Sequence, residues 1–144
     1  EHNRIADLAF MAYRDVSGQR WQPFLKAALE RNPVTVEACK KLTAGQVYQT
    51  LLQMDSQSIY SENRLAQPDE VWNFQTGDGI EKALALWDVL ESRQRLGNGC
   101  LLLTENNVRL EYDGVVYEFS SHKGFAPACW DMQFNATRQR AVAN

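Results

Sequence analysis

Residues 76–119 read TGDGIEKALALWDVLESRQRLGNGCLLLTENNVRLEYDGVVYEF, and this stretch predicts most of the fold. Its first part predicts a helix over Ile80–Arg93, because apolar residues recur there at helical spacing. The apolar face consists of Ile80, Ala83, Leu84, Leu86, Trp87 and Leu90. Thr76 or Asp78 can cap the start of this helix, and Gly97-Asn98-Gly99 ends it.

Three strands are predicted after this helix, at Cys100–Thr104, Val108–Tyr112 and Val115–Phe119. The first is a continuous apolar run, which is typical of a strand buried on both faces, whereas the other two alternate apolar and polar residues. Asp113-Gly114 is a two-residue hairpin signal, and Gly114 is expected at positive φ. The three segments predict a small antiparallel sheet.

The chain before residue 57 is predicted to be helical. Apolar residues follow helical spacing over Arg4–Tyr13, Trp21–Arg31 and Val34–Leu42, and Thr43 can cap one more helix. The predicted fold class is therefore α+β, an N-terminal helical hairpin or bundle followed by a helix packed on a small antiparallel β-sheet. We expect a helical region at 1–57, a linker at 58–69 and an α+β region at 70–144.

Residues 5–33 resemble a tetratricopeptide-like helical hairpin. The resemblance is carried by Ala12-Tyr13, Gly18, Trp21, Leu25, Ala28-Leu29 and Asn32-Pro33, which are similar to that family's small residues, turn glycine and ALxxNP ending. A degenerate second unit can extend over 34–55. The same residues also fit plain amphipathic helices that pack together, because a repeat array usually needs at least about three repeats.

The stretch 70–124 resembles the transglutaminase-like (papain-related) core. That family's helix begins Gly-Asp-Cys-x-x-Lys-Ala, and the matching residues here are Gly77-Asp78-Gly79-Ile80-Glu81-Lys82-Ala83. Its next strands carry His-x-Trp-x-Glu and then Phe-Asp-Pro-Thr, where this chain has Asn107-Val108-Arg109-Leu110-Glu111 and Phe119-Ser120-Ser121. The resemblance implies a cleft between the helix start and the strands that face it.

Three positions depart together from that family's catalytic pattern. The nucleophile position is Gly79, the general-base position is Asn107 and the orienting-acid position is Ser120. Glycine offers no nucleophile, an amide does not take a proton from a thiol, and a hydroxyl carries no negative charge. We therefore expect no catalytic residue here and a core that has lost its chemistry.

The remnant of the cleft is the predicted ligand site. Gly77, Asp78 and Gly79 open a helix, where free backbone N–H groups can bind a carboxylate or another anion. The partner we expect is a protein, a peptide or a small polar ligand. The expected function is a non-catalytic binding or scaffolding module, and we expect the chain to be part of a larger protein.

Two pairs of side chains complete this predicted site. Trp72 and Phe74 precede the helix and would wall one side of the cleft. Asn107 and Ser120 would offer neutral hydrogen bonds from the other side. The prediction requires Gly79, Asn107 and Ser120 to lie close together in the fold.

An enzyme that uses an existing cysteine is the alternative. Of Cys39, Cys100 and Cys129, only Cys129 has a histidine nearby in sequence, His122, so a cysteine hydrolase or acyltransferase would use that pair. Three widely spaced cysteines argue against a disulfide framework, and reduced thiols are more typical of a cytoplasmic protein. A purely structural accessory domain is a third possibility.

Composition excludes several other classes. The chain has 144 residues, of which 44% are hydrophobic and 23% charged, as in ordinary globular proteins. Fifteen basic against eighteen acidic residues give a net charge of −3, which does not favour nucleic acid. No apolar run approaches the roughly 20 residues of a membrane span. We expect no nucleic-acid partner, no membrane insertion, no metal and no cofactor.

Overall fold

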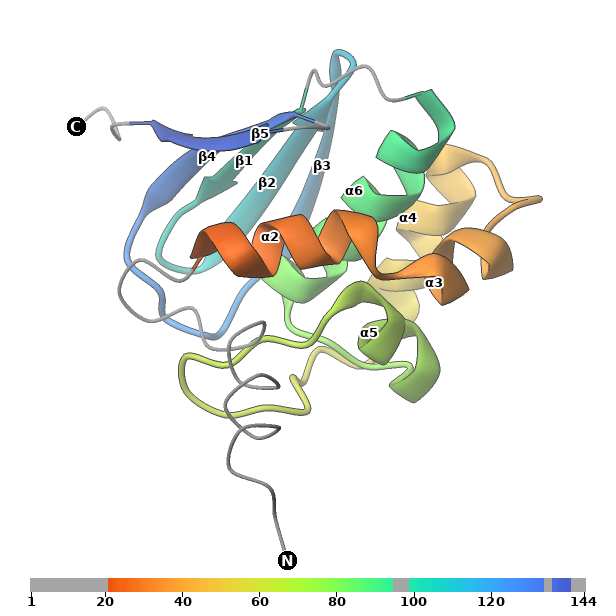
Figure 1. Cartoon of the computed structure of the whole chain (residues 1–144). Coiled ribbons are helices and arrows are strands. Elements are labelled where there is room, and N and C mark those ends of the chain that lie inside the picture. The colour runs from red at the N-terminus through yellow and green to blue at the C-terminus, as the bar shows by residue number, and fades with distance from the viewer. Residues whose placement is uncertain (1–20, 95–98, 134–135, 141–144) are drawn as a thin grey trace, which may run out of the picture.

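The computed structural model of this chain describes residues 21–94, 99–133 and 136–140. The predicted helix at Arg4–Tyr13 and most of the tetratricopeptide-like stretch lie outside these residues. The elements are α2 (Trp21–Glu30), α3 (Pro33–Ala38), α4 (Ala44–Gln53), α5 (Pro68–Phe74), α6 (Gly79–Gln94), β1 (Gly99–Leu103), β2 (Asn107–Tyr112), β3 (Val115–Ser120), β4 (Ala128–Gln133) and β5 (Ala136–Arg140). The predicted α+β class is confirmed, with helices that precede an antiparallel sheet (Figure 1).

The strands form one five-stranded sheet in the order β3-β2-β1-β4-β5, and every neighbouring pair is antiparallel. Strand β1 lies at the centre, where Leu101 is opposite Leu110 of β2 and Trp130 of β4. Its residues alternate between buried and half-buried. The prediction that this strand is buried on both faces is therefore wrong, because its alternate residues are half-buried and the helices that the structure describes pack on one face of the sheet (Figure 1).

The predicted hairpin between β2 and β3 is confirmed. Asp113 has a φ of 51° and Gly114 a φ of 79°, and Tyr112 pairs with Val115 on either side of the turn. Positive φ at both central residues matches the twist of the two strands. A Cβ added to Gly114 would meet nothing within 4 Å, so the backbone conformation alone favours glycine there.

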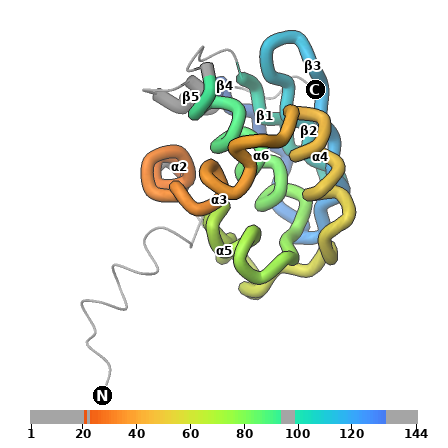
Figure 2. Tube along the Cα trace, turned by 90° about the vertical axis from the view of Figure 1, so that its right-hand side faces the viewer, coloured from red at the N-terminus to blue at the C-terminus, as the bar shows by residue number. Residues whose placement is uncertain are grey.

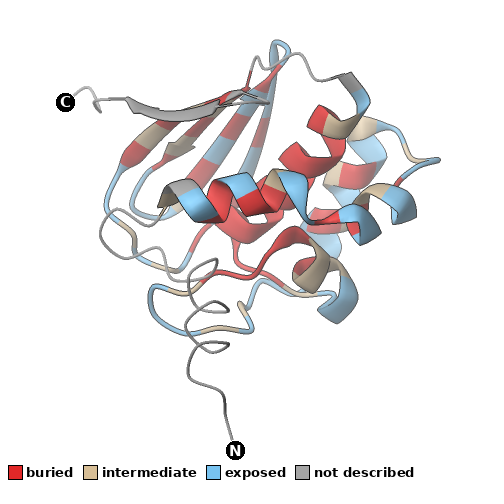
Figure 3. Ribbon diagram, viewed as in Figure 1, coloured by how far each residue is buried: buried red, intermediate tan, exposed pale blue. Residues whose placement is uncertain are grey.

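Helix α6 is the centre of the molecule. Figure 2 shows α2, α3, α4 and α5 around it, with the sheet behind. Every residue from Gly77 to Glu91 is buried (Figure 3). The single apolar face that the sequence predicts is therefore only part of its packing surface, and four of its charged residues are at most 3% exposed, namely Glu81, Lys82, Asp88 and Glu91. Burying a charged group without a partner is costly, so the hydrogen bonds of these residues constrain which segments pack around α6.

One hydrophobic core joins the helical and the sheet parts of the chain. Phe24 of α2 and Leu51 of α4 belong to the same buried cluster as Trp87 of α6 and Trp130 of β4. Residues 65–68, within the segment expected to be a linker, are buried as well. Among the residues described, no helix is long and apolar enough to cross a lipid bilayer.

The sequence does not predict α5, β4 and β5. The expected three strands are corrected to five, and Cys129 lies in β4. Ala128, Trp130 and Met132 are buried at alternate positions of β4, which is the period of a half-buried strand. This pattern is too short to predict a strand alone. Strand β4 is stabilised by pairing with β1, which is distant in sequence.

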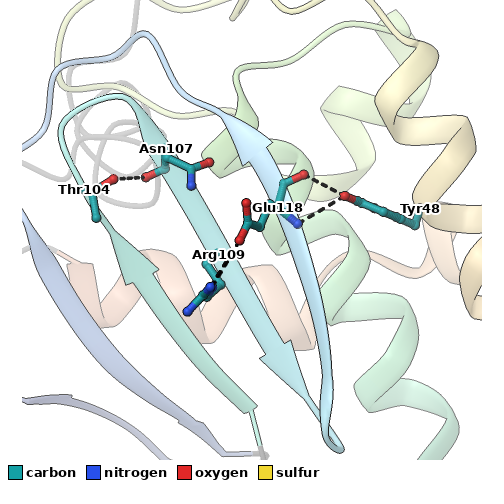
Figure 4. A network of polar contacts seen from close by, with 5 residues as sticks. All are labelled: Tyr48, Thr104, Asn107, Arg109 and Glu118. Carbon is teal, nitrogen blue, oxygen red and sulfur yellow. Dashed lines mark hydrogen bonds and ion pairs between the residues drawn. The ribbon is translucent and has the colours of Figure 1, made fainter.

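Strand β3 is an edge of the sheet, and α4 covers part of it. Thr43 caps α4 in a capping box, as predicted. The Tyr48 hydroxyl donates to the Glu118 carbonyl oxygen at 2.9 Å and accepts the Glu118 N–H at 3.2 Å (Figure 4). The Tyr48 ring also packs edge-on against Tyr117 and Phe119. These bonds satisfy backbone groups that an open edge would offer to another chain.

Candidate functional site

The start of α6 packs directly against the end of β3. An ideal Cβ built on Gly79 would lie 2.1 Å from the Ser120 carbonyl oxygen and 2.9 Å from the Phe119 Cβ. Ser120 in turn pairs with Asn107 on β2. The backbones of Gly79, Asn107 and Ser120 are therefore brought together, and only a residue without a side chain fits at position 79.

The side chains of Asn107 and Ser120 belong to the outer face of the sheet. Successive residues of a strand point to opposite faces, and Val108 and Phe119 occupy the buried positions. Ser120 is exposed, whereas the next residue, Ser121, is buried beside the start of α6. The predicted lining therefore needs correcting, because the strand alternation turns Asn107 and Ser120 away from the helix.

Asp78 ties the start of α6 to the segment after β3. It is 2% exposed, and its carboxylate accepts hydrogen bonds from the Ser121 hydroxyl at 2.6 Å and from the His122 N–H at 2.6 Å. It also accepts the Ile80 N–H at 3.1 Å, so Asp78 rather than Thr76 caps the helix. The Asp78 carboxylate therefore binds groups of the same chain and not an external ligand.

Glu81 is the residue at this site that the sequence reasoning missed. It is fully buried, and its carboxylate accepts the Ala66 N–H at 2.5 Å, the Ser58 hydroxyl at 2.7 Å and the Asp78 N–H at 2.7 Å. Burial raises the pKa of Glu81, and these hydrogen bonds oppose the rise. A glutamate three residues after the helix cap is the capping-box signature, which could have revealed it.

Two lysines connect the same region to the segment between α4 and α5. Lys82 donates to the Met54 carbonyl oxygen at 2.8 Å, and Lys123 donates to the carbonyl oxygens of Tyr60 at 2.7 Å and Arg64 at 2.8 Å. Burial lowers the pKa of both lysines, and nearby carboxylates oppose this change. The two lysines therefore anchor the carbonyl groups of a segment that lies outside the named helices and strands.

Groups of the chain itself occupy much of the anion site predicted at the start of α6. The Gly77 N–H donates to the Asp55 carbonyl oxygen at 3.0 Å, the Asp78 N–H to Glu81 and the Ile80 N–H to Asp78. The helix dipole favours any nearby anion, including a carboxylate of the chain. The prediction of free N–H groups is therefore wrong for Gly77 and Asp78.

The two aromatic residues of the predicted site lie on α5. Trp72 is half-buried and packs against the core, whereas Phe74 is 63% exposed. Two pockets lined by described residues lie elsewhere, one along α4 and one between α2, α3 and α6. Neither pocket is lined by any of the seven predicted site residues, so neither of them is the predicted ligand site.

Cys129 and His122 lie in different parts of the fold. Strand β4, which carries Cys129, is three strands away from β3, or about 14 Å at the usual strand spacing. His122 follows β3 and is held by Asp78 on the helix side of the sheet. The Cys129 sulfur lies 3.6 Å from that of Cys100 on the neighbouring strand, so the Cys129 thiol faces another thiol.

Comparison with known proteins adds no relative to this description. No family model matches the chain, and neither a curated protein nor a solved structure matches it.

Proposed function

We propose that this chain is a non-catalytic binding or scaffolding module built on a degenerate transglutaminase-like core. The observation that carries the proposal is the contact between Gly79 and Ser120. A carbonyl oxygen of β3 lies 2.1 Å from an ideal Cβ at position 79, in the space that a nucleophilic side chain would need. A thiol there would force α6 away from the sheet, so the position supports packing rather than chemistry.

The buried carboxylates at the start of α6 support the same function. A general acid or base must come within hydrogen-bond reach of its substrate. Glu81 is 0% exposed, and Asp78 is 2% exposed. Both accept hydrogen bonds from the backbone and hydroxyl groups of this chain. Their role is therefore to hold three segments of the chain together.

The surface of α5 is where we expect a protein or peptide partner to bind. Phe74 at the end of α5 exposes 63% of its surface, and Trp72 of the same helix is half-buried. Aromatic residues are enriched in protein interfaces, where they bury a large area with few rotatable bonds. The net charge of −3 gives no reason to expect nucleic acid instead.

Thiol reactivity in the native protein tests the absence of catalysis. Iodoacetamide labelling at neutral pH should be slow at Cys39, because burial raises the pKa of this thiol to about 11. Peptide mass spectrometry should find Cys100 and Cys129 labelled no faster than in the unfolded chain. Rapid, selective labelling of Cys129 that is lost in His122→Ala would contradict the proposal and favour the cysteine hydrolase or acyltransferase. Cys100→Ser is the matched control, because it removes the thiol next to Cys129 and leaves both Cys129 and His122 in place.

Peptide display against the immobilised chain tests the binding function. Peptides enriched on the wild type should bind Phe74→Ser about tenfold more weakly, because an exposed aromatic anchor carries much of an interface's energy. Val115→Ser is the matched control, since Val115 is also exposed, at 49%, but lies in the hairpin. Failure to enrich any peptide, or an equal loss in both variants, would overturn the assignment of α5 as the binding surface.

A further inference from the structure

A pocket of about 300 Å³ lies between the end of α2, helix α3 and the second half of α6. Its lining residues are Leu29, Glu30, Asn32, Pro33, Val36, Glu37, Asp88 and Ser92. This volume is at the lower end of the range for small-molecule sites. The pocket shares no residue with the α5 surface, so its occupancy is independent of the proposed function.

Asp88 is the unusual member of this lining. It is only 1% exposed, and its Oδ2 is the one buried side-chain oxygen or nitrogen without a hydrogen-bond partner among the described residues. Buried polar atoms of native proteins nearly always have partners, so an unpaired carboxyl oxygen on a residue that lines a pocket requires an explanation. Burial and the negative charge of Asp69 raise the pKa of Asp88 to about 9.

The polar groups near Asp88 already have partners. The Asp69 carboxylate accepts from the backbone N–H and the hydroxyl of Thr35. The Asn32 amide donates to two carbonyl groups of α2 and to the side chain of Gln67. Arg93 donates to two carbonyl groups that follow α3. Within the part of the chain that the structure describes, the Oδ2 of Asp88 therefore remains without a hydrogen-bond partner, because these neighbouring polar groups bond to other parts of the chain.

We propose that this pocket binds a small organic cation, an alkylguanidine or alkylamine, whose charged head pairs with the Asp88 carboxylate. The hydrocarbon part of the ligand would pack against Leu29, Pro33 and Val36, which supply the apolar wall. A guanidinium suits the site best, because its planar donors match a carboxylate in a bidentate pair and it is weakly hydrated.

Charged groups of both signs surround the pocket. Glu30 and Glu37 at its mouth are exposed, and each lies 3.9 Å from a lysine on the surface. Such exposed pairs contribute little to stability and leave the acidic groups accessible to a ligand. The other titratable or charged groups near Asp88 are Asp69 on α5, Cys39 after α3 and Arg93 on α6. Arg93 is the cation of this set, and it is held by carbonyl groups.

Binding of a cation should release a proton. Asp88 carries its proton at neutral pH, so pairing with a guanidinium displaces that proton to the buffer and leaves a carboxylate beside the cation. The affinity should therefore rise with pH, by at most about tenfold per pH unit below the pKa of Asp88. A guanidinium stays charged throughout this range, so the pH dependence reports on the protein alone.

Isothermal titration calorimetry of the chain with butylguanidinium at pH 6, 7 and 8 tests this proposal. We expect binding that strengthens with pH and a proton release of up to one, read from buffers of different ionisation enthalpy. Asp88→Asn should weaken binding at least about tenfold and abolish the proton release. Glu37→Gln at the mouth, the matched control, should weaken binding less than about threefold.

A second variant keeps the proposal testable if Asp88→Asn does not fold. Val36→Phe adds bulk to the apolar wall without changing the charge, and it should abolish binding. The neutral butyramide should bind the wild type much more weakly than butylguanidinium. Absence of binding by butylguanidinium at millimolar concentration, or binding that is unchanged by pH and by Asp88→Asn, would overturn the proposal.

Discussion

Replacement of Gly79 by alanine tests the contact on which the interior at the start of α6 depends. Gly79 is not among the glycines with positive φ, so the effect of this change is steric rather than conformational. The new Cβ would lie 2.1 Å from the Ser120 carbonyl oxygen and 2.7 Å from the Ser120 carbonyl carbon. Both atoms belong to the backbone, so no rotamer change can relieve the overlap.

The expected loss of stability depends on how far α6 and β3 must move apart. Nonbonded carbon and oxygen atoms prefer a separation of about 3.5 Å, so α6 and β3 would have to separate by about 1 Å or more. Overpacking of a well-packed interior costs about 1–3 kcal/mol. We expect Gly79→Ala to lie at the upper end, about 3 kcal/mol, which lowers the melting temperature by about 6–12 °C in a domain of this size.

A glycine in the first turn of α4 provides the matched control. An ideal Cβ on Gly45 would meet only the Thr43 hydroxyl oxygen, at 4.0 Å. Gly45→Ala should therefore raise stability by about 0.5–1 kcal/mol through helix propensity. Urea unfolding followed by circular dichroism measures both variants. A Gly79→Ala variant within about 0.5 kcal/mol of the wild type would refute the reasoning.

Three further predictions concern other residues of the interior and the hairpin. Asp78→Ala should reduce the free energy of unfolding by about 2–4 kcal/mol in urea titrations, because it removes a helix cap and leaves the Ser121 hydroxyl and the His122 N–H without their acceptor; the thermodynamic role assigned to Asp78 fails if the loss is below about 0.5 kcal/mol. Gly114→Val should cost about 1 kcal/mol or more, since a β-branched residue is strained at a φ of 79°, and an unchanged melting temperature would contradict this. Burial raises the pKa of Asp88 in the folded state to about 9, from the ordinary value of 3.8, so its stabilising effect is present below about pH 4 and is lost as pH rises toward 9. Asp88→Asn should therefore be increasingly more stable than the wild type between pH 4 and 9, and a difference that does not change with pH would show that Asp88 is not buried as a neutral acid.

Residues of the candidate site show where prediction from sequence stops. The backbones of Gly79, Asn107 and Ser120 lie close together, as the prediction for the ligand site required, because element order limits which segments can meet. The motifs in 70–124 single out these three positions. They do not predict which face of the sheet the two side chains occupy. A shift by one residue along a strand moves a side chain to the opposite face, so an alignment of short motifs cannot decide this.

The sequence by itself determined the elements whose signals are local. Periodic apolar residues predicted α6, β2 and β3 to within one or two residues, Thr43 predicted the cap of α4, and Asp113-Gly114 predicted the turn. In each case the physical cause lies within a few residues. It is a helical or strand period, a side chain that accepts a nearby N–H, or a backbone that favours positive φ.

Only the tertiary structure decided which groups are buried together. Asp78 finds its partner Ser121 43 residues away, and the Glu81 carboxylate accepts the N–H of Ala66 15 residues earlier in the chain. Asp88 becomes a buried acid because α6 is enclosed both by the sheet and by the other helices (Figure 2). Burial and hydrogen-bond partners arise from segments that are distant in sequence, and no local pattern records which segments will meet.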